Sequence, residues 1–393
     1  MPLRRAFKLS GIVWILSLAL APAGISSAQT SEVVIGGTFS RTGVYARFGR
    51  DLERGFLLWQ DEVNARGGLM GKQVRAVLAN DASNRERAVR FYQQLITRAD
   101  LIFTPYGSLL TGAVMPVAEG AGVPCIAAAA ADQSLWENGG RWCVQMLNPV
   151  GTFLAGAVEL AAAQGARRLA LVYRRSRFVN GVMDGARAMA RDVGLDVVTV
   201  RTYRRLAEAQ SEIREVAVYE PDLVLGGGFR PDLPGAGFLP DAIALTRGAR
   251  SGNVKARLFT WLVGPAFAKF GEVLGSKAEG MTGNTVWKPF FRTRGNARFV
   301  EAYRQRWGDK PDAHAAQGYA VGQLIEEAML KAGSLQKRAV RNALFALNTD
   351  TVFGRFRVNA KGLQVKKRNA IVQWQRGVRQ VVWPSWLQTA PLR

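Results

Sequence analysis

The chain has 393 residues, 48% hydrophobic and 21% charged, which is enough for two globular domains and excludes a disordered protein. Its 53 basic residues outnumber its 30 acidic ones by 23, a surplus that raises nucleic acid or another anionic surface as a partner. The basic residues are scattered along the chain and form no block, so we interpret the surplus as a basic solvated surface and expect no nucleic-acid partner.

The N-terminal residues predict a signal peptide over residues 1–28. The segment MPLRRAFKLS is basic, the run GIVWILSLALAPA is short and apolar, and Ser26 and Ala28 are the small residues of a cleavage site. We expect the mature chain to begin near Gln29 and to be soluble in the periplasm, with an uncleaved anchor as the alternative. No cysteine follows the apolar run, and no later stretch reaches the about 18 apolar residues of a membrane span.

After this segment, apolar runs alternate with helical spacing. Strands are predicted at 33–39, 72–80, 101–105, 123–128, 168–173, 195–200 and 221–227, and helices from Gly49 and over 88–96, 151–165 and 180–194. An α/β fold follows, with parallel sheets covered by helices on both faces. Such sheets place ligands at the carboxyl ends of their strands.

Turn residues mark the ends of several elements. Gly67 and Gly68 reverse the first helix into the second strand, and Asp81 with Ser83 is predicted to start the next helix. Towards the C-terminus we expect helices over 297–308 and 312–333. The stretches TVFGRFRVNAKG and RNAIVQWQRG then predict a closing, hairpin-like pair.

Few residues suit catalysis or metal binding. The sequence has one histidine, His314, no CxxC, no phosphate-binding loop and no paired nucleophile and base, so we expect no enzyme, metal or cofactor. Cys125 and Cys143 are the only cysteines. Export and an even count favour a disulfide between them, and two separate buried thiols are the alternative.

Three stretches carry a resemblance to a known family: GVYARFGRDLERGFLLWQDEVNARGGLMGKQV, ANDASNRERAV, and FGRFRVNAKG with IVQWQRG. The chain after residue 31 resembles type I periplasmic solute-binding proteins, of the branch that binds leucine, other branched-chain amino acids, amides and related acids for ABC importers. The resemblance implies two Rossmann-like lobes joined by a three-crossing hinge. Residues 31–148 with 287–362 would form one lobe, and 149–286 with 363–393 the other.

The resemblance also implies how the protein works. A small-molecule ligand binds between the lobes and favours the closed state, which ABC permease subunits in the membrane then recognise. We expect a monomer. A periplasmic sensor subunit that reports to a membrane receptor has the same fold and is the alternative.

Ser108, Ala129 and Ala131 are predicted to contact the ligand. Ser108 follows the strand LIFTP and begins a helix, where free N–H groups and the helix dipole suit a carboxylate; a plain N-cap is the alternative. Ala129 and Ala131 match a loop whose backbone touches the ligand in the family, although simple packing explains them as well. Amino-acid binders often carry Thr or Ser where Ala131 stands.

Phe48, Phe178 and Phe229 would surround an apolar ligand body, with ordinary core packing as the alternative. Family members place a carboxylate near a C-lobe strand end to hold the ammonium group, but residues 258–267, around Trp261, contain no Asp or Glu. The cations that could make the cleft mouth positive, with a solvated surface charge as the alternative for each, are Arg174, Arg175, Arg177, Arg230 and Lys288. We therefore expect an anionic, rather apolar ligand such as an aromatic or branched acid.

Overall fold

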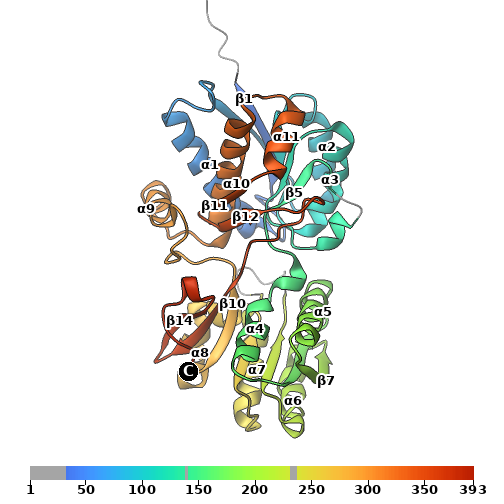
Figure 1. The fold of residues 1–393 in the computed structure, drawn as a ribbon, viewed down its shortest axis with the longest axis vertical. Helices are drawn as coiled ribbons and strands as arrows, with labels where there is room; N and C mark the ends of the chain where they lie inside the picture. The colour runs from blue at the N-terminus through green and yellow to red at the C-terminus, as the bar shows by residue number, and fades with distance from the viewer. Residues whose placement is uncertain (1–31, 138–139, 231–236) are drawn as a thin grey trace, which may run out of the picture. The chain divides into compact units, whose positions relative to one another are not determined.

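Two separate β-sheets organise the computed structural model, which describes residues 32–137, 140–230 and 237–393 (Figure 1). The predicted signal peptide lies outside these residues. The first sheet is parallel, with strand order β2-β1-β3-β4-β5. Its strands are β1 (Val33–Phe39), β2 (Val74–Asn80), β3 (Leu101–Phe103), β4 (Cys125–Ala127) and β5 (Cys143–Gln145).

Helices alternate with these strands, as the apolar spacing predicts. They are α1 (Ala46–Ala65), α2 (Arg85–Leu95) and α3 (Ser108–Ala121). Strands β1, β3 and β4 are buried almost throughout, because helices cover a parallel sheet on both faces. The glycine pair acts as predicted: Gly67 and Gly68 have φ angles of 95° and 79°, in the left-handed region that glycine tolerates.

The second sheet has seven strands in the order β14-β13-β10-β9-β8-β6-β7. Five are parallel: β6 (Arg168–Arg174), β7 (Asp196–Tyr203), β8 (Leu223–Gly227), β9 (Leu258–Trp261) and β10 (Met281–Thr285). The last two, β13 (Ala370–Gln375) and β14 (Val378–Trp383), are antiparallel to their neighbours. Its helices are α4 (Ala155–Ala163), α5 (Arg177–Asp192), α6 (Ala209–Arg214), α7 (Leu239–Ser251) and α8 (Ala268–Leu274).

Between β10 and β13 the chain returns to the first sheet. This segment contains α9 (Asn296–Trp307), α10 (Ala313–Ala332), α11 (Lys337–Phe345) and the hairpin of β11 (Asn348–Thr351) with β12 (Gly354–Arg357). Helix α10 lies very close to α1: a Cβ atom at Gly318 would be 1.9 Å from the carbonyl oxygen of Leu52. Only glycine permits this backbone approach.

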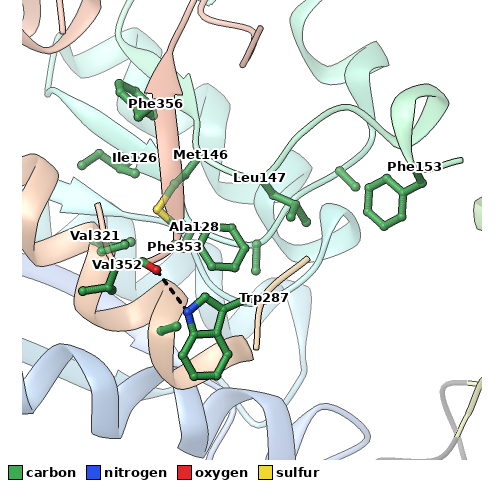
Figure 2. Close-up of a cluster of buried hydrophobic side chains, with 14 of the residues drawn as sticks. Ile126, Ala128, Met146, Leu147, Phe153, Trp287, Val321, Val352, Phe353 and Phe356 are labelled. Carbon is green, nitrogen blue, oxygen red and sulfur yellow. Dashed lines mark hydrogen bonds between the residues drawn. The ribbon is translucent and has the colours of Figure 1, made fainter. Parts of the chain in front are cut away.

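A buried cluster anchors the returning segment (Figure 2). Trp287, which follows β10, donates its indole N–H to the carbonyl oxygen of Val352 over 3.1 Å and to Asn296 Oδ1 over 3.0 Å. The same cluster contains side chains from β4 and the residue after it, the segment after β5, α10 and the β11–β12 hairpin. They are Ile126, Ala128, Met146, Leu147, Val321, Phe353 and Phe356. Residues far apart in sequence thus share one core.

Short 3-10 turns complete the described elements: η1 (Gln133–Trp136), η2 (Val150–Thr152), η3 (Leu206–Glu208), η4 (Ala217–Tyr219), η5 (Gly264–Ala266), η6 (Gly275–Ala278) and η7 (Ser385–Leu387). None of the helices in the described ranges combines the length and the apolar character needed to cross a bilayer.

Two expectations about local structure are wrong, and one helix has no counterpart among the predictions. The stretches TVFGRFRVNAKG and RNAIVQWQRG do not pair, because β12 pairs with β11 while β13 pairs with β10 and β14. The predicted turn at QRG instead joins β13 to β14. Asp81 does not cap α2: it is buried and accepts hydrogen bonds from the hydroxyls of Thr38 and Ser40, and Asn84 is the N-cap. Helix α11 was not predicted at all.

Candidate functional site

The predicted carboxylate contact, Ser108, is the first residue of α3. Gly107 precedes it as the N-cap with a φ of 88° and has no side chain to cap the helix, so Ser108 is not a plain N-cap. Ser108 Oγ instead accepts a hydrogen bond from the backbone N–H of Asp132 over 3.0 Å. Its own hydroxyl hydrogen stays available, beside the free N–H groups of the first helical turn. This end of α3 can therefore bind an anion.

The two predicted alanines lie beside Ser108 in the chain segment that follows β4. Ala129 forms a parallel bridge with Tyr106, and both alanines are buried. The carbonyl oxygen of Ala131 already accepts the N–H of Val150 over 2.8 Å. A methyl group at Ala131 adds no polar atom at this position.

Phe48 belongs to an aromatic cluster at this edge of the first sheet. Its ring stacks on Tyr106 with centroids 4.6 Å apart and an interplanar angle of 22°, and it lies 4.8 Å from the ring of His314. Tyr106 also contacts His314 and Tyr45, at 5.3 and 5.4 Å. The sequence reasoning found Phe48 but missed its three partners. Tyr45 lies three residues before Phe48, and Tyr106 lies two residues before Ser108, so their positions could have indicated them. His314 comes from a distant segment, and no local pattern indicates it.

Two carboxylates, those of Asp51 and Asp312, lie near the His314 ring of this cluster. Asp312 caps α10 by accepting the N–H groups of His314 and Ala315 over 2.8 and 3.1 Å. Burial would raise the pKa of Asp312, but the His314 ring and these N–H groups outweigh it and hold that pKa below its ordinary value. Burial, with the charge of Asp312 as a second cause, raises the pKa of Asp51 to about 6.

Phe178 and Phe229 meet at the carboxyl edge of the second sheet. Phe178 follows β6 and Phe229 follows β8, and their ring centroids are 5.6 Å apart. Phe238 stacks on Phe229 at 4.6 Å and 29°, and Phe153 makes an edge contact with Phe178 at 5.6 Å. We call Phe153, Phe178, Phe229 and Phe238 the phenyl cluster. The sequence reasoning identified two of its members, and nothing in the local pattern separates Phe153 and Phe238 from core residues.

The interpretation of Arg174 and Lys288 as solvated surface charges is wrong. Arg174 is buried and forms an ion pair with Asp241 over 2.9 Å, and Tyr203 donates its hydroxyl to the same carboxylate over 2.7 Å. Lys288 donates to the carbonyl oxygen of Ala266 over 2.7 Å, and burial lowers its pKa to about 8. Burying a charge without a partner is costly, which explains why both are held this way.

The other predicted cations are more accessible. Arg175 is exposed and donates to Thr202 Oγ1 over 3.0 Å, and Arg177 is exposed and pairs with Asp132 over 2.7 Å. Arg230 is half-buried next to Phe229. Because Asp132 also donates its N–H to Ser108, Arg177 places a positive charge near the predicted carboxylate contact.

Trp261 ends β9 and is fully buried. Residues 258–267 offer no carboxylate to hold an ammonium group. Asp241 is an acid of the same half of the molecule, but its carboxylate accepts hydrogen bonds from Arg174 and Tyr203. A cavity of about 600 Å³ lies elsewhere, between α8 and the β13–β14 turn, and is lined by Trp374, Phe290 and Arg379 among others. It is separate from the strand ends that carry the predicted contacts.

Cys125 and Cys143 are paired in register on β4 and β5. Both are free, buried thiols, with Sγ atoms 2.7 Å apart. This agrees with the alternative of two buried thiols, and the disulfide stays a prediction. Within residues 32–137, 140–230 and 237–393, no three His, Cys, Asp or Glu side chains are grouped to hold a metal ion.

Comparisons with known proteins agree with this architecture. The model of the periplasmic binding protein family matches residues 32–379. A Leu/Ile/Val-binding protein homolog 7 from Brucella suis is 24% identical, covering 96% of this chain and 98% of that protein.

Two solved structures are similar in fold. One, of a putative branched-chain amino acid ABC transporter from Silicibacter pomeroyi, has a TM-score of 0.78 and 20% identity, covering 92% of this chain and 99% of the other. The second, of a solute-binding protein from R. palustris in complex with benzoate, has a TM-score of 0.68 and 18% identity, covering 90% and 96%.

Proposed function

Because the chain belongs to the periplasmic binding protein family, we propose that it is the exported substrate-binding subunit of an ABC importer. Its ligand is a small carboxylate with an apolar body, aromatic or branched. The two lobes are residues 31–148 with 287–362 and residues 149–286 with 363–393. Members of this family bind solutes and are not enzymes, and the mechanism has no covalent step.

The observation that carries the proposal is the pairing of an anion site with a cluster of phenyl rings. On the first sheet, Ser108 keeps a free hydroxyl hydrogen at the start of α3, and Arg177 pairs with the neighbouring Asp132. On the second sheet, the phenyl cluster presents rings 4.6 to 5.6 Å apart at the ends of β6 and β8. A carboxylate suits the first and an apolar body suits the second.

At the second edge, the lack of an accessible acid argues against an ammonium group and so against a zwitterionic ligand held there. Residues 258–267 contain no acid, and Asp241 is fully buried in its ion pair with Arg174. Because no part of Asp241 is exposed, a ligand cannot reach its carboxylate. The Leu/Ile/Val-binding relative and the benzoate-bound solved structure mark the two ligand classes to compare.

In this mechanism, ligand capture and lobe closure are one equilibrium. The open protein binds the carboxylate at α3, and closure brings the phenyl cluster against the apolar body. Only the closed state offers both sets of contacts, so the ligand shifts the population towards it. The closed protein then docks on the permease, and opening releases the ligand.

The test is a thermal-shift screen of the chain from Gln29 onward against benzoate, phenylacetate, isovalerate, leucine and valine. A ligand at 100 times its Kd stabilises the protein by about 2.7 kcal/mol, which corresponds to a rise of roughly 2 °C or more. We expect benzoate, phenylacetate or isovalerate to raise the melting temperature more than leucine does. A rise with leucine and valine alone would contradict the ligand class, and no rise with any carboxylate would contradict the anion site.

Export and import need separate measurements. N-terminal sequencing of the periplasmic fraction should give a chain that begins near Gln29. Uptake of the identified ligand should require both this protein and a permease with its ATPase. Normal uptake without the protein would exclude the importer role, whatever the ligand screen shows.

A further inference from the structure

Helix α11 and its neighbours gather five cations that are dispersed in the sequence. We call Arg98, Arg141, Lys337, Arg338 and Arg341 the basic face. Lys337 Nζ donates to the carbonyl oxygen of Ile96 over 3.2 Å, which ties α11 to the end of α2 near Arg98. Arg341 Nε donates to the carbonyl oxygen of Arg141. Three segments separated by tens to hundreds of residues thus form one surface, where α11 and α2 are neighbours (Figure 1).

These charges are not neutralised. None of the five forms an ion pair with any residue in the described ranges. Glu119 is the nearby acid, but its carboxylate accepts the backbone N–H groups of Arg141, Trp142 and Cys143. Partial burial lowers the pKa of Arg341 below its ordinary value; Glu119 opposes that shift, and the guanidinium of Arg338 adds to it. Like charges kept this close repel each other.

The opposite situation holds along α1, α9 and α10. Five cations on or beside these helices pair with acids: Arg54 with Asp309, Arg66 with Glu326, Arg294 with Glu327, Arg298 with Glu62, and Arg306 with Asp61. The excess of positive charge is therefore distributed unevenly over the surface of this part of the chain. The basic face differs from that surface because its five cations lie on adjoining segments and form no ion pair with the described residues.

The composition of the basic face indicates which kind of partner it fits. Arg98, Arg141 and Arg338 are exposed, and Lys337 and Arg341 are half-buried. No large apolar side chain of α11 is among the exposed ones of the described residues. Protein interfaces usually centre on buried aromatic or apolar anchors. A surface that offers charge without such anchors suits a layer of anionic lipid headgroups, which attracts each nearby Lys or Arg.

We propose that the basic face docks the protein reversibly on the anionic surface of a phospholipid bilayer. Such docking would concentrate the binding protein in the plane of the membrane that holds its permease. The proposal goes beyond ligand binding and does not depend on which ligand is bound. Attraction of this kind weakens as ionic strength rises, because salt screens exposed charges.

The experiment is vesicle sedimentation with the chain from Gln29 onward, which contains the whole compact unit Glu32–Arg393 and lacks the basic, apolar N-terminal segment. Vesicles of phosphatidylglycerol and phosphatidylcholine are compared with phosphatidylcholine alone, at low and high salt. The test variant is K337Q/R338Q/R341Q. The matched control is R191Q/R214Q/K255Q, which removes the same charge from exposed positions that have no ion pair in the described residues.

We expect salt-sensitive binding to phosphatidylglycerol vesicles that falls at least 10-fold in K337Q/R338Q/R341Q, because each cation near an anionic surface contributes about fivefold. The control should stay within about twofold of the parent chain. The melting temperature of each triple variant is measured as well, because Lys337 and Arg341 also donate hydrogen bonds to the carbonyl oxygens of Ile96 and Arg141. R338Q alone keeps both hydrogen bonds and should still weaken binding to phosphatidylglycerol vesicles several-fold.

Three results would overturn the proposal. They are equal binding to pure phosphatidylcholine, equal loss in the two triple variants, and no binding to phosphatidylglycerol vesicles. Binding to immobilised polyglutamate without binding to vesicles would likewise overturn it and would identify an acidic protein segment as the partner.

Discussion

The carboxyl edges of the two sheets differ in chemistry although the chain builds both from the same strand–helix units. At the first edge the rings of Phe48, Tyr106 and His314 lie next to the carboxylates of Asp51 and Asp312. At the second edge the cluster consists of phenyl rings alone. The first edge mixes aromatic rings with groups that change charge, while the second does not.

One ion pair of the second edge is kept inside. Arg174, Asp241 and Tyr203 form a buried network below the phenyl cluster, with Asp241 fully shielded from solvent. The difference gives the two edges separate tasks in the proposed function: Ser108 at the first edge binds the carboxylate, and the phenyl cluster at the second edge selects an apolar shape. Each task can be removed by a different substitution.

The largest effect is expected from Asp241→Ala, which leaves the guanidinium of Arg174 buried without its partner. Removing one member of a buried ion pair costs about 3–5 kcal/mol of unfolding free energy. Urea unfolding measures this loss. Asp184→Ala is the matched control, because it removes an exposed Asp–Arg pair of the same half of the molecule and should cost no more than about 1 kcal/mol. Equal losses in the two variants would show that the buried Arg174–Asp241 pair contributes no more to the unfolding free energy than an exposed pair does.

Ser108→Ala should have the next largest effect, on affinity. A hydroxyl hydrogen bond to a charged group contributes about 1.5–3 kcal/mol, so the Kd for a carboxylate ligand should rise roughly 10- to 150-fold. Isothermal titration calorimetry measures it. Ser108→Thr keeps the hydroxyl and should recover much of the affinity. An unchanged Kd in the alanine variant would remove Ser108 from the site.

Phe229→Leu tests the second edge. An aromatic pair contributes about 0.5–1.5 kcal/mol beyond the area it buries, so the Kd for an aromatic acid should rise roughly 2- to 12-fold. The Kd for an aliphatic acid should change less. Phe290→Leu, which alters an exposed ring outside the phenyl cluster, serves as the control. If both acids lose affinity equally, the cluster fills space without selecting aromatic ligands.

Asp51→Asn should have the smallest effect, a change in melting temperature whose size depends on pH. Because the pKa of Asp51 is raised to about 6 in the folded state, the protonated form is favoured there and folding stability decreases as the pH rises from about 4 to 6. The asparagine variant lacks this penalty. Its melting temperature should exceed that of the parent at pH 7 to 8, and the difference should shrink towards pH 4. A difference that is constant across this range would contradict the shifted pKa.

Local patterns predicted the framework well. Strand β1 has the predicted bounds, and β2, β6 and β8 lie within or close to theirs, because a buried strand in a parallel sheet is a continuous apolar run between turn residues. Helix α1 begins at Ala46, before the predicted Gly49, and α4 covers Ala155–Ala163 within the predicted 151–165. These ends differ because helix ends depend on caps that several residues can provide. Helix α11 was missed because a short, basic segment shows only a narrow apolar stripe.

The sequence by itself determined the alternation of strands and helices and the resemblance to periplasmic solute-binding proteins, and it predicts a ligand contact at the start of α3. These depend on residues close together in the chain, whose spacing reflects local geometry. The tertiary structure alone decided which distant residues meet: His314 with Phe48, Phe238 with Phe229, and Arg174 with Asp241.

The same holds for charge. The sequence shows basic residues scattered along the chain, and the fold brings five of them together at α11 while it pairs those of α1 and α9 with acids. The physical reason is that contacts between distant segments depend on how well their side chains fill the whole core, which is close-packed. The position of each surface charge follows from that packing, and a one-dimensional pattern does not contain it.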